Sequence, residues 1–394
     1  MNFRNSGVKY TNNPYRKISM KIGTITFSNS QENYGQILQC FALVDFLRSL
    51  GHDAFLIRAK HVDIDDRTIL SKFIGRLKSL LHPIRFLNNY LENREIARQH
   101  SAMESDVKKH PRNFDRFIKN NIPTTDTWYD DITIYKTPPE ADAYVCGSDQ
   151  IWGGGDTFMY LQFASCQSIK ISYAASFGGF VPSQITQKRI ANYLSDFKWI
   201  SLRENTGTEL CKSMGFKDAE TVPDPTLLLS VDRYKNLYDK NLSVGSIPYI
   251  FLYLLGNEIP LKVDEIFDFA TKNNLRIIYV TAHGRQDNHV KEYPEISQWL
   301  QLIEHSDYVI TNSYHGTIFS ILYHKKFLSI PLVGIRSRMN TRLDELLSRY
   351  NLKDRLYSNS LEQLFNEIDY TCFEKVNQKE RTYIGDKFTK LLVD

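Results

Sequence analysis

The sequence lacks the features that mark secreted, membrane-spanning and metal-dependent proteins. Its longest apolar run, residues 247–255, contains Pro248 and is far shorter than the ~20 residues that cross a bilayer. The first twenty residues are polar and basic, so they do not predict a secretory signal. The five cysteines are scattered, and no pair has the spacing of a zinc or redox site. We therefore expect a cytoplasmic protein with reduced thiols and without a bound metal.

The composition is that of an ordinary globular protein. Hydrophobic residues make up 42% of the chain and charged residues 24%, which does not predict disorder. At 394 residues the chain is too long for one hydrophobic core, so two domains are expected. The net charge of +4 is unevenly distributed, because residues 67–119 contain 12 Lys and Arg against 5 Asp and Glu. One segment therefore carries the whole basic excess.

The first part of the chain alternates between strand and helix patterns. Short apolar runs predict strands, and apolar residues at helical spacing predict helices. The expected strands are residues 21–27, 54–58, 143–146, 169–174 and 199–202, and the expected helices are residues 37–50, 184–195 and 204–214. Such βαβ alternation builds a parallel sheet. A Pro-Asp-Pro sequence at 223–225 predicts the end of this series.

A second series of the same kind follows. Its expected strands are residues 249–255, 276–281, 308–311 and 327–331, and its expected helices are residues 263–271, 296–305, 317–323 and 340–350. We predict an α/β protein with two Rossmann-like doubly wound domains that face a cleft, where ligands of such folds bind. The expected order is a loose tail (1–20), an N-terminal domain (21–225), a C-terminal domain (226–372) and a helix (373–394) that could return to the N-terminal domain.

The basic segment predicts a helical insertion in the first domain, at about residues 67–120. Apolar residues at helical spacing indicate one helix over residues 69–81 and a second over residues 87–103. The favoured interpretation is that these helices pack on the first domain. The alternative is a basic surface that approaches anionic lipid or a phosphate-bearing acceptor.

Polar side chains follow four of the expected strands at the points where the strands end. They lie in the segments 33–36, 147–150, 203–205 and 312–316. Because the carboxyl ends of parallel strands share one edge of a sheet, we expect these segments to meet at the cleft. In the second of them, Asp149 is either a catalytic base or a residue that hydrogen-bonds its own turn.

Two charged side chains stand out in these segments. His315 lies between a strand end and a helix N-terminus, which favours anions, and histidine can transfer a proton at neutral pH. The alternative is a histidine that caps the helix or satisfies a buried carbonyl. Arg203 ends an apolar strand, where a buried cation needs an anionic partner. That partner is either a ligand or an internal carboxylate, Glu204 or Asp224.

Other motifs carry less weight. The three glycines at 153–155 lack the lysine and the spacing of a phosphate-binding loop, so they predict a flexible loop. The sequence His-Gly-Arg at 283–285 follows a strand and could line the cleft, although an ordinary turn is favoured. Nucleic-acid binding is not expected, because the charge is mild and the basic segment lacks interleaved aromatic residues.

Six motifs together resemble the polysaccharide pyruvyl transferase family. They occur in the family's order, span about residues 21–355, and read NYGQILQCFAL, DAYVCGSDQIW, ISYAASFG, ISLREN, VPDPTLLL and ITNSYHGTIFSILYHKKF. The resemblance implies a fold like that of GT-B glycosyltransferases. It also implies transfer of the pyruvyl group of phosphoenolpyruvate onto two hydroxyls of a sugar in a surface or capsular polysaccharide precursor. A pyruvate ketal would form and phosphate would leave, with no cofactor besides phosphoenolpyruvate as co-substrate.

The resemblance also implies roles for particular residues. Arg203 matches an arginine that holds the anionic donor, and His315 matches a histidine proposed as proton donor. Ser313 stands where many members have an arginine, so the missing charge must come from Arg336, Arg338 or Arg342. The full prediction has His315 and Asp149 as catalytic residues and no metal. The donor-binding residues are Arg203, Ser313, Tyr314, Arg338 and Arg342, and the acceptor-binding residues are Asn33, Tyr34, Gln36 and Gln150.

Two other functions stay open at this point. The same fold accommodates a glycosyltransferase that uses a nucleotide sugar, and the arginine missing at Ser313 allows a catalytically silent glycan-binding or regulatory relative. The expected partners are phosphoenolpyruvate and a glycan acceptor. We hypothesise a lipid-linked acceptor and peripheral contact with the inner membrane through the basic segment.

Overall fold

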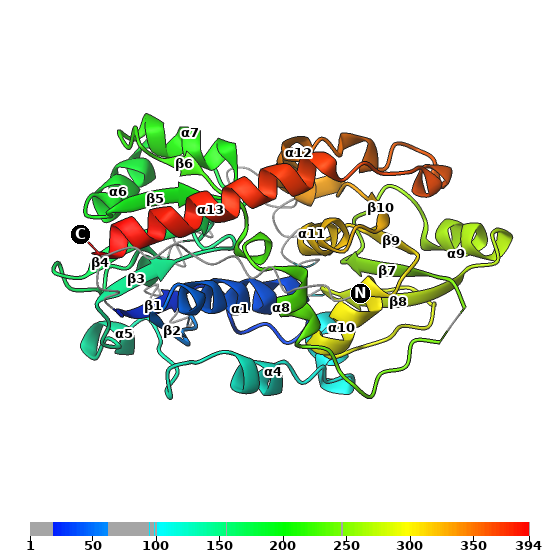
Figure 1. Cartoon of the computed structure of the whole chain (residues 1–394), viewed down its shortest axis with the longest axis horizontal. Coiled ribbons are helices and arrows are strands. Elements are labelled where there is room, and N and C mark those ends of the chain that lie inside the picture. The colour runs from blue at the N-terminus through cyan, green and yellow to red at the C-terminus, as the bar shows by residue number, and fades with distance from the viewer. Residues whose placement is uncertain are drawn as a thin grey trace, which may run out of the picture.

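The computed structural model describes residues 19–61, 101–154, 156–245 and 247–393, together with Arg94 and Arg98. Two parallel β-sheets lie side by side in it, with helices packed around them (Figure 1). This arrangement confirms the predicted α/β fold class. No helix among the described residues is both long enough and apolar enough to cross a bilayer.

The N-terminal sheet has six strands in the order β2-β1-β3-β4-β5-β6. All neighbouring strands in it are parallel. The strands are β1 (Lys21–Ile25), β2 (Asp53–Leu56), β3 (Ala143–Cys146), β4 (Ile169–Ala175), β5 (Trp199–Leu202) and β6 (Glu220–Thr221). The helices of this part are α1 (Tyr34–Ser49), α4 (Phe114–Asn121), α5 (Thr133–Lys136), α6 (Gln184–Leu194) and α7 (Asn205–Ser213). The sequence did not predict β6, because two half-buried polar residues give no strand pattern.

The C-terminal sheet has four parallel strands in the order β10-β9-β7-β8. They are β7 (Tyr249–Leu255), β8 (Arg276–Ala282), β9 (Tyr308–Thr311) and β10 (Lys326–Ser329). The helices here are α8 (Val231–Lys235), α9 (Val263–Lys272), α10 (Ile296–Glu304), α11 (Tyr314–Leu322) and α12 (Asn340–Arg349). Short 3-10 turns complete the chain: η1 (Thr157–Tyr160), η2 (Pro225–Leu227), η3 (Gly334–Met339), η4 (Lys353–Arg355) and η5 (Leu361–Phe365).

The last helix, α13 (Thr371–Val393), runs across both sheets (Figure 1). Near its start, Phe373 packs edge-on against Tyr350, which follows α12. Near its end, Phe388 packs against Trp199 of the N-terminal sheet. This helix therefore contacts elements of both halves. The exact domain limits given above stay a prediction.

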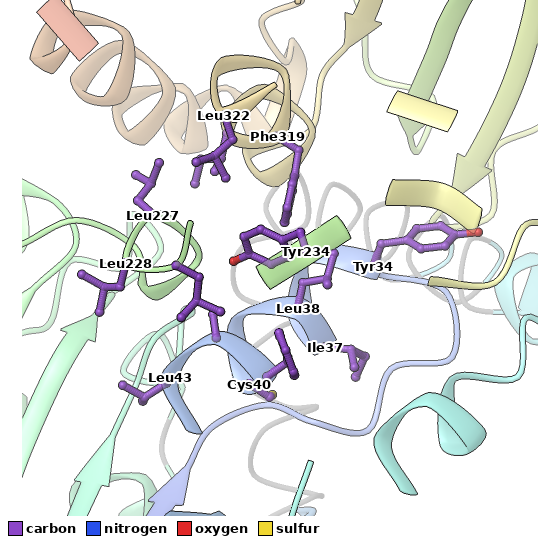
Figure 2. Packing of buried hydrophobic residues seen from close by; sticks show 14 of the residues in the cluster. Tyr34, Ile37, Leu38, Cys40, Leu43, Leu227, Leu228, Tyr234, Phe319 and Leu322 are labelled. Atoms are coloured by element: carbon purple, nitrogen blue, oxygen red, sulfur yellow. The ribbon is translucent and has the colours of Figure 1, made fainter. Parts of the chain in front are cut away.

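One core cluster joins the two sheets through α1 and α11. Figure 2 shows Leu38 and Leu43 of α1, Leu227 and Leu228, and Phe319 and Leu322 of α11 as members of this cluster. Tyr234 lies between them, and its ring meets the Phe319 ring edge-on with the centroids 4.9 Å apart. Burial of these side chains removes apolar surface from water, which stabilises the junction. The N-termini of α1 and α11 are thereby brought together.

Two expectations need correction or lie outside the described residues. Helix α11 begins at Tyr314, three residues earlier than the predicted 317, because Ser313 Oγ accepts a hydrogen bond from Gly316 N and caps the helix. Of the predicted insertion, the helix at 69–81 and most of the helix at 87–103 fall outside the described residues. Residues 101–109 are helical. The first 18 residues of the predicted tail also lie outside the described residues.

Candidate active site

The ends of β3 and β5 and the start of α11 meet around one buried carboxylate, Asp224. Its Oδ2 accepts hydrogen bonds from Ser148 Oγ at 3.0 Å and Arg203 Nη1 at 3.3 Å, and its Oδ1 accepts one from Thr226 N at 3.0 Å. The same Oδ2 lies 3.5 Å from His315 Nε2. Burial alone would raise the pKa of Asp224, but the charges of His315 and Arg203 outweigh it and hold the pKa well below its ordinary value. Asp224 is therefore an ionised carboxylate without solvent exposure.

Arg203 is almost fully buried at the end of β5. Its Nε donates to Glu204 Oε1 at 2.9 Å, its Nη1 donates to Asp224, and its Nη2 lies 3.9 Å from Asp149 Oδ1. Of the two alternatives left open by the sequence, the internal ion pair is thus present in the structure. Nη2 nevertheless forms no hydrogen bond with any of the described residues. A buried donor without a partner is costly, so this atom is available to a ligand.

His315 lies in the first turn of α11, and the start of α1 encloses its ring. A Cβ atom on Gly35 would lie 2.2 Å from both Cγ and Nδ1 of the imidazole, so only glycine fits at this point of α1. The Nε2 atom is buried and forms no hydrogen bond within the described part of the chain. An imidazole in this position, beside a buried carboxylate, can carry a proton to a ligand.

Tyr314 lies between two guanidinium groups. The Cζ atom of Arg203 is 4.7 Å from the ring centroid, and the Cζ atom of Arg342 is 5.6 Å from it. Within the described residues, Arg342 makes no hydrogen bond or ion pair. Burial, followed by the neighbouring charge of Arg203, lowers the pKa of Arg342. Arg342 therefore forms no direct ion pair, while the more distant charges of Glu204 and Asp149 act in the opposite sense and raise its pKa.

Three pockets open where the two sheets meet, and Arg342 lines all of them. The smallest, about 180 Å³, is also lined by His315, Asp149, His283 and Arg336. The second, about 290 Å³, reaches the other side of Tyr314. The third, about 430 Å³, has an apolar wall that includes Phe177, Phe180 and Met339. We call the 180 Å³ space the histidine pocket.

The structure brings most of the predicted site residues to these pockets. Lining the histidine pocket are Asn33, Asp149, Gln150, Ser313, Tyr314, His315 and Arg342. Arg338 is exposed and lines the largest pocket. Asp149 Oδ1 accepts a hydrogen bond from Gln150 N at 2.8 Å, so the local turn bond is present as well.

Two of the predicted acceptor-binding residues do not line any of these pockets. Tyr34 is fully buried, its OH donates to Pro294 O at 2.6 Å, and its ring stacks on Trp299. The predicted contact of Tyr34 with an acceptor is therefore wrong, because this side chain belongs to the core. Gln36 Oε1 accepts a hydrogen bond from Ser30 N at 3.0 Å, which ties its side chain to the loop that precedes α1.

Sequence reasoning did not assign a functional role to Asp224 or His283. Asp224 was considered only as a partner for Arg203, although its place between two prolines was a visible sign of a fixed backbone. For His283 the sequence left two interpretations, a residue that lines the cleft and an ordinary turn, and the turn was favoured. His283 follows β8, has a left-handed φ of 59°, and lines the histidine pocket. Its pocket position depends on packing between the two sheets, which one sequence does not show.

One group of side chains elsewhere has the composition of a metal site. His61 Nδ1 lies 2.8 Å from Asp131 Oδ2 and 3.1 Å from Asp156 Oδ1. A histidine ion-paired with two carboxylates accounts for this geometry. None of these residues lines the pockets described above.

The sequence model of the polysaccharide pyruvyl transferases matches residues 33–332, which is well over half of the chain. The chain belongs to the polysaccharide pyruvyl transferase family. Membership makes the protein a transferase of polysaccharide biosynthesis and implies a polysaccharide acceptor. The matched range contains Asp149, Arg203, Asp224 and His315. A search of curated proteins finds no match to this chain.

Solved structures of other proteins share the fold of this pyruvyl transferase family member. A UDP-GlcNAc 2-epimerase from Methanocaldococcus jannaschii aligns with a TM-score of 0.52 at 11% identity, over 95% of this chain and 99% of the other. A protein from Listeria monocytogenes named as a UDP-N-acetylglucosamine 2-epimerase aligns with a TM-score of 0.50 at 8% identity, over 95% and 91%. At such low identity the likeness shows the fold alone, which is GT-B-like.

Proposed function

We propose that the protein transfers the pyruvyl group of phosphoenolpyruvate onto two hydroxyls of one sugar in a surface or capsular polysaccharide precursor. The product is a pyruvate ketal, and phosphate is released. Family membership supports the transferase class and the polysaccharide acceptor. The donor and the ketal chemistry are the proposed part.

The observation that carries this proposal is Arg342, a cation that lines the histidine pocket and forms no direct ion pair among the described residues. Arg203, whose buried Nη2 has no hydrogen-bond acceptor there, lines the adjoining pocket of about 290 Å³, which Arg342 also lines. A small ligand with a carboxylate and a phosphate suits these two guanidinium groups, since guanidinium binds either anion in a bidentate manner. Arg342 thus supplies the charge that is missing at Ser313.

The chemistry assigns a step to each nearby group. His315 donates a proton to the methylene carbon C3 of phosphoenolpyruvate, which makes C2 electrophilic. Asp149 accepts the proton of one sugar hydroxyl as its oxygen bonds to C2. Arg342, with Arg203 in the adjoining pocket of about 290 Å³, stabilises the negative charge of the donor in a site that is partly shielded from water. Asp224 stabilises the protonated imidazole of His315 before the transfer.

Arg342→Ala tests the donor site without any acceptor. We expect phosphoenolpyruvate to raise the Tm of the wild-type protein and to have little effect on the variant, because the free cation that binds the donor is gone. Differential scanning fluorimetry over a range of phosphoenolpyruvate concentrations measures this shift. Arg48→Ala is the matched control, since Arg48 lies in the last turn of α1, far from the pockets that open at the helix N-terminus.

The same titration separates the proposal from its main alternative. Stabilisation by UDP-GlcNAc and not by phosphoenolpyruvate would contradict the proposed donor and favour a glycosyltransferase. Equal phosphoenolpyruvate shifts in the wild type and in Arg342→Ala would remove Arg342 from the donor site.

A lipid-linked acceptor at the inner membrane surface stays part of the proposal. It rests on the basic residues 67–119, of which residues 67–93, 95–97 and 99–100 lie outside the described part of the chain. Binding to liposomes that contain anionic lipid, at low salt, would support it. Failure to bind under those conditions would contradict it.

A further inference from the structure

We propose that His283 is a second catalytic base, which takes the proton of one of the two sugar hydroxyls that react. This assignment rests on the proposed pyruvyl transfer. Ketal formation requires a proton to leave each of two hydroxyls. The histidine pocket offers two side chains suited to accept one, the carboxylate of Asp149 from the N-terminal sheet and the imidazole of His283 from the C-terminal sheet.

A residue of the N-terminal half, Glu32, fixes the backbone position of His283. The backbone N–H of His283 donates to Glu32 Oε1 at 2.8 Å, and Glu32 follows β1. The left-handed φ of 59° is uncommon for a residue with a side chain, so the surrounding contacts must hold it. The charges of Arg336 and Arg342 act on its side chain. His283 thus lies on the wall of the pocket that His315 also lines.

The charges around His283 favour a neutral ring. Burial, followed by the charges of Arg336 and Arg342, lowers the pKa of His283 to about 4, with a further contribution from Arg112 that Asp149 opposes. Glu32, whose carboxylate binds the backbone of His283, has its pKa raised to about 7 by its own burial. Burial and these charges therefore keep the ring of His283 neutral at neutral pH.

The two histidines of the pocket have opposite environments. His315 Nε2 lies 3.5 Å from the carboxylate of Asp224. His283 lies among arginines, whose charges lower its pKa. Groups placed beside charges of opposite sign are suited to act as an acid and a base in one reaction.

His315, Asp149 and His283 together account for every proton that moves in the reaction. His315 gives a proton to C3, and the first hydroxyl oxygen bonds to C2 as its proton moves to Asp149. The bond between C2 and the phosphate oxygen then breaks, and the second hydroxyl oxygen bonds to C2 as its proton moves to the unprotonated ring nitrogen of His283. One of the two collected protons leaves with phosphate as hydrogen phosphate, and the other returns to His315 through solvent.

His283→Gln tests this role by activity. We expect kcat/KM for acceptor-dependent phosphate release to fall about 100-fold, while phosphoenolpyruvate still raises the Tm as in the wild type. Added imidazole should restore part of the activity of His283→Ala, which a merely structural histidine would not allow. His289→Gln is the matched control, because His289 belongs to the same loop but stacks on Phe267 and does not line the histidine pocket.

Three results would overturn the assignment. The first is a loss below tenfold in His283→Gln. The second is a midpoint near 6.5 for the ring in ¹³C-histidine NMR, with the His283 signal identified by its absence in the variant. The third is no phosphate release by the wild-type protein with any acceptor, which overturns the proposed function and His283 with it. A reduced rate in the variant, with a ring that stays neutral to below pH 5, supports the assignment.

Discussion

Asp224→Asn should lower kcat/KM for phosphate release by about 100-fold or more and should also destabilise the protein. Asparagine has the same shape as aspartate but no charge, so it leaves both Arg203 and His315 without their shared anion. Removing one partner of a buried ion pair typically costs about 3 kcal/mol or more. The free energy of unfolding from denaturant titration and the rate of phosphate release measure the two effects.

The stability effect of Asp224→Asn should depend on pH. The pKa of Asp224 in the folded protein lies well below its ordinary value of 3.8, so its stabilisation is complete above that pH and is lost only as the pH falls further. We therefore expect the full difference between wild type and variant at pH 7. Asp218→Asn, at an exposed position, is the control and should change neither quantity. An Asp224→Asn protein as stable and as active as Asp218→Asn would contradict the described network.

Gly35→Ala should inactivate the enzyme although alanine is the better helix former. On helix propensity alone the change would stabilise α1 by about 0.5–1 kcal/mol. The new Cβ atom would lie 2.2 Å from the imidazole of His315, so the ring must move away from Asp224. Overpacking of this kind costs about 1–3 kcal/mol, and displacement of the proton donor should lower kcat by at least tenfold.

Gly385→Ala is the matched control for that substitution. Gly385 also lies in a helix, α13, but its nearest neighbour, Leu50 Cδ2, would be 3.9 Å from the new Cβ atom, which is an ordinary contact. We expect this variant to be fully active and as stable as the wild type or more so. If both alanine variants behaved alike in thermal unfolding and in phosphate release, Gly35 would not be packed against His315.

Local patterns in the sequence were sufficient for the fold. The apolar run at 249–255 and the β-rich runs at 143–146, 199–202 and 308–311 predicted their strands within a few residues, since burial of a parallel sheet demands such runs. The start of α11 was misplaced because Gly316 and the polar residues before it resemble a loop. Burial and the cap by Ser313 extend the helix through them.

A site residue could be predicted where its neighbours in the sequence are enough to place it at the cleft. The structure places His315 and Arg342 on the wall of the histidine pocket, while the roles expected for them stay predictions. Tyr34 was misassigned because its neighbours in space, Trp299 and Tyr253, come from the other sheet. The link between Asp224 and His315 likewise depends on how the two sheets pack, which no local pattern specifies.

The most direct test of the proposed function is phosphate release from phosphoenolpyruvate in D₂O with galactoside and ManNAc-type acceptors. We expect release only when a suitable acceptor is present, a product ketal whose methyl group carries a single deuterium, and loss of both in His315→Gln. The deuterium reports protonation of C3 by a solvent-exchangeable group, the role given to His315. No release with any acceptor, together with no rise in Tm on adding phosphoenolpyruvate, would contradict the proposed function.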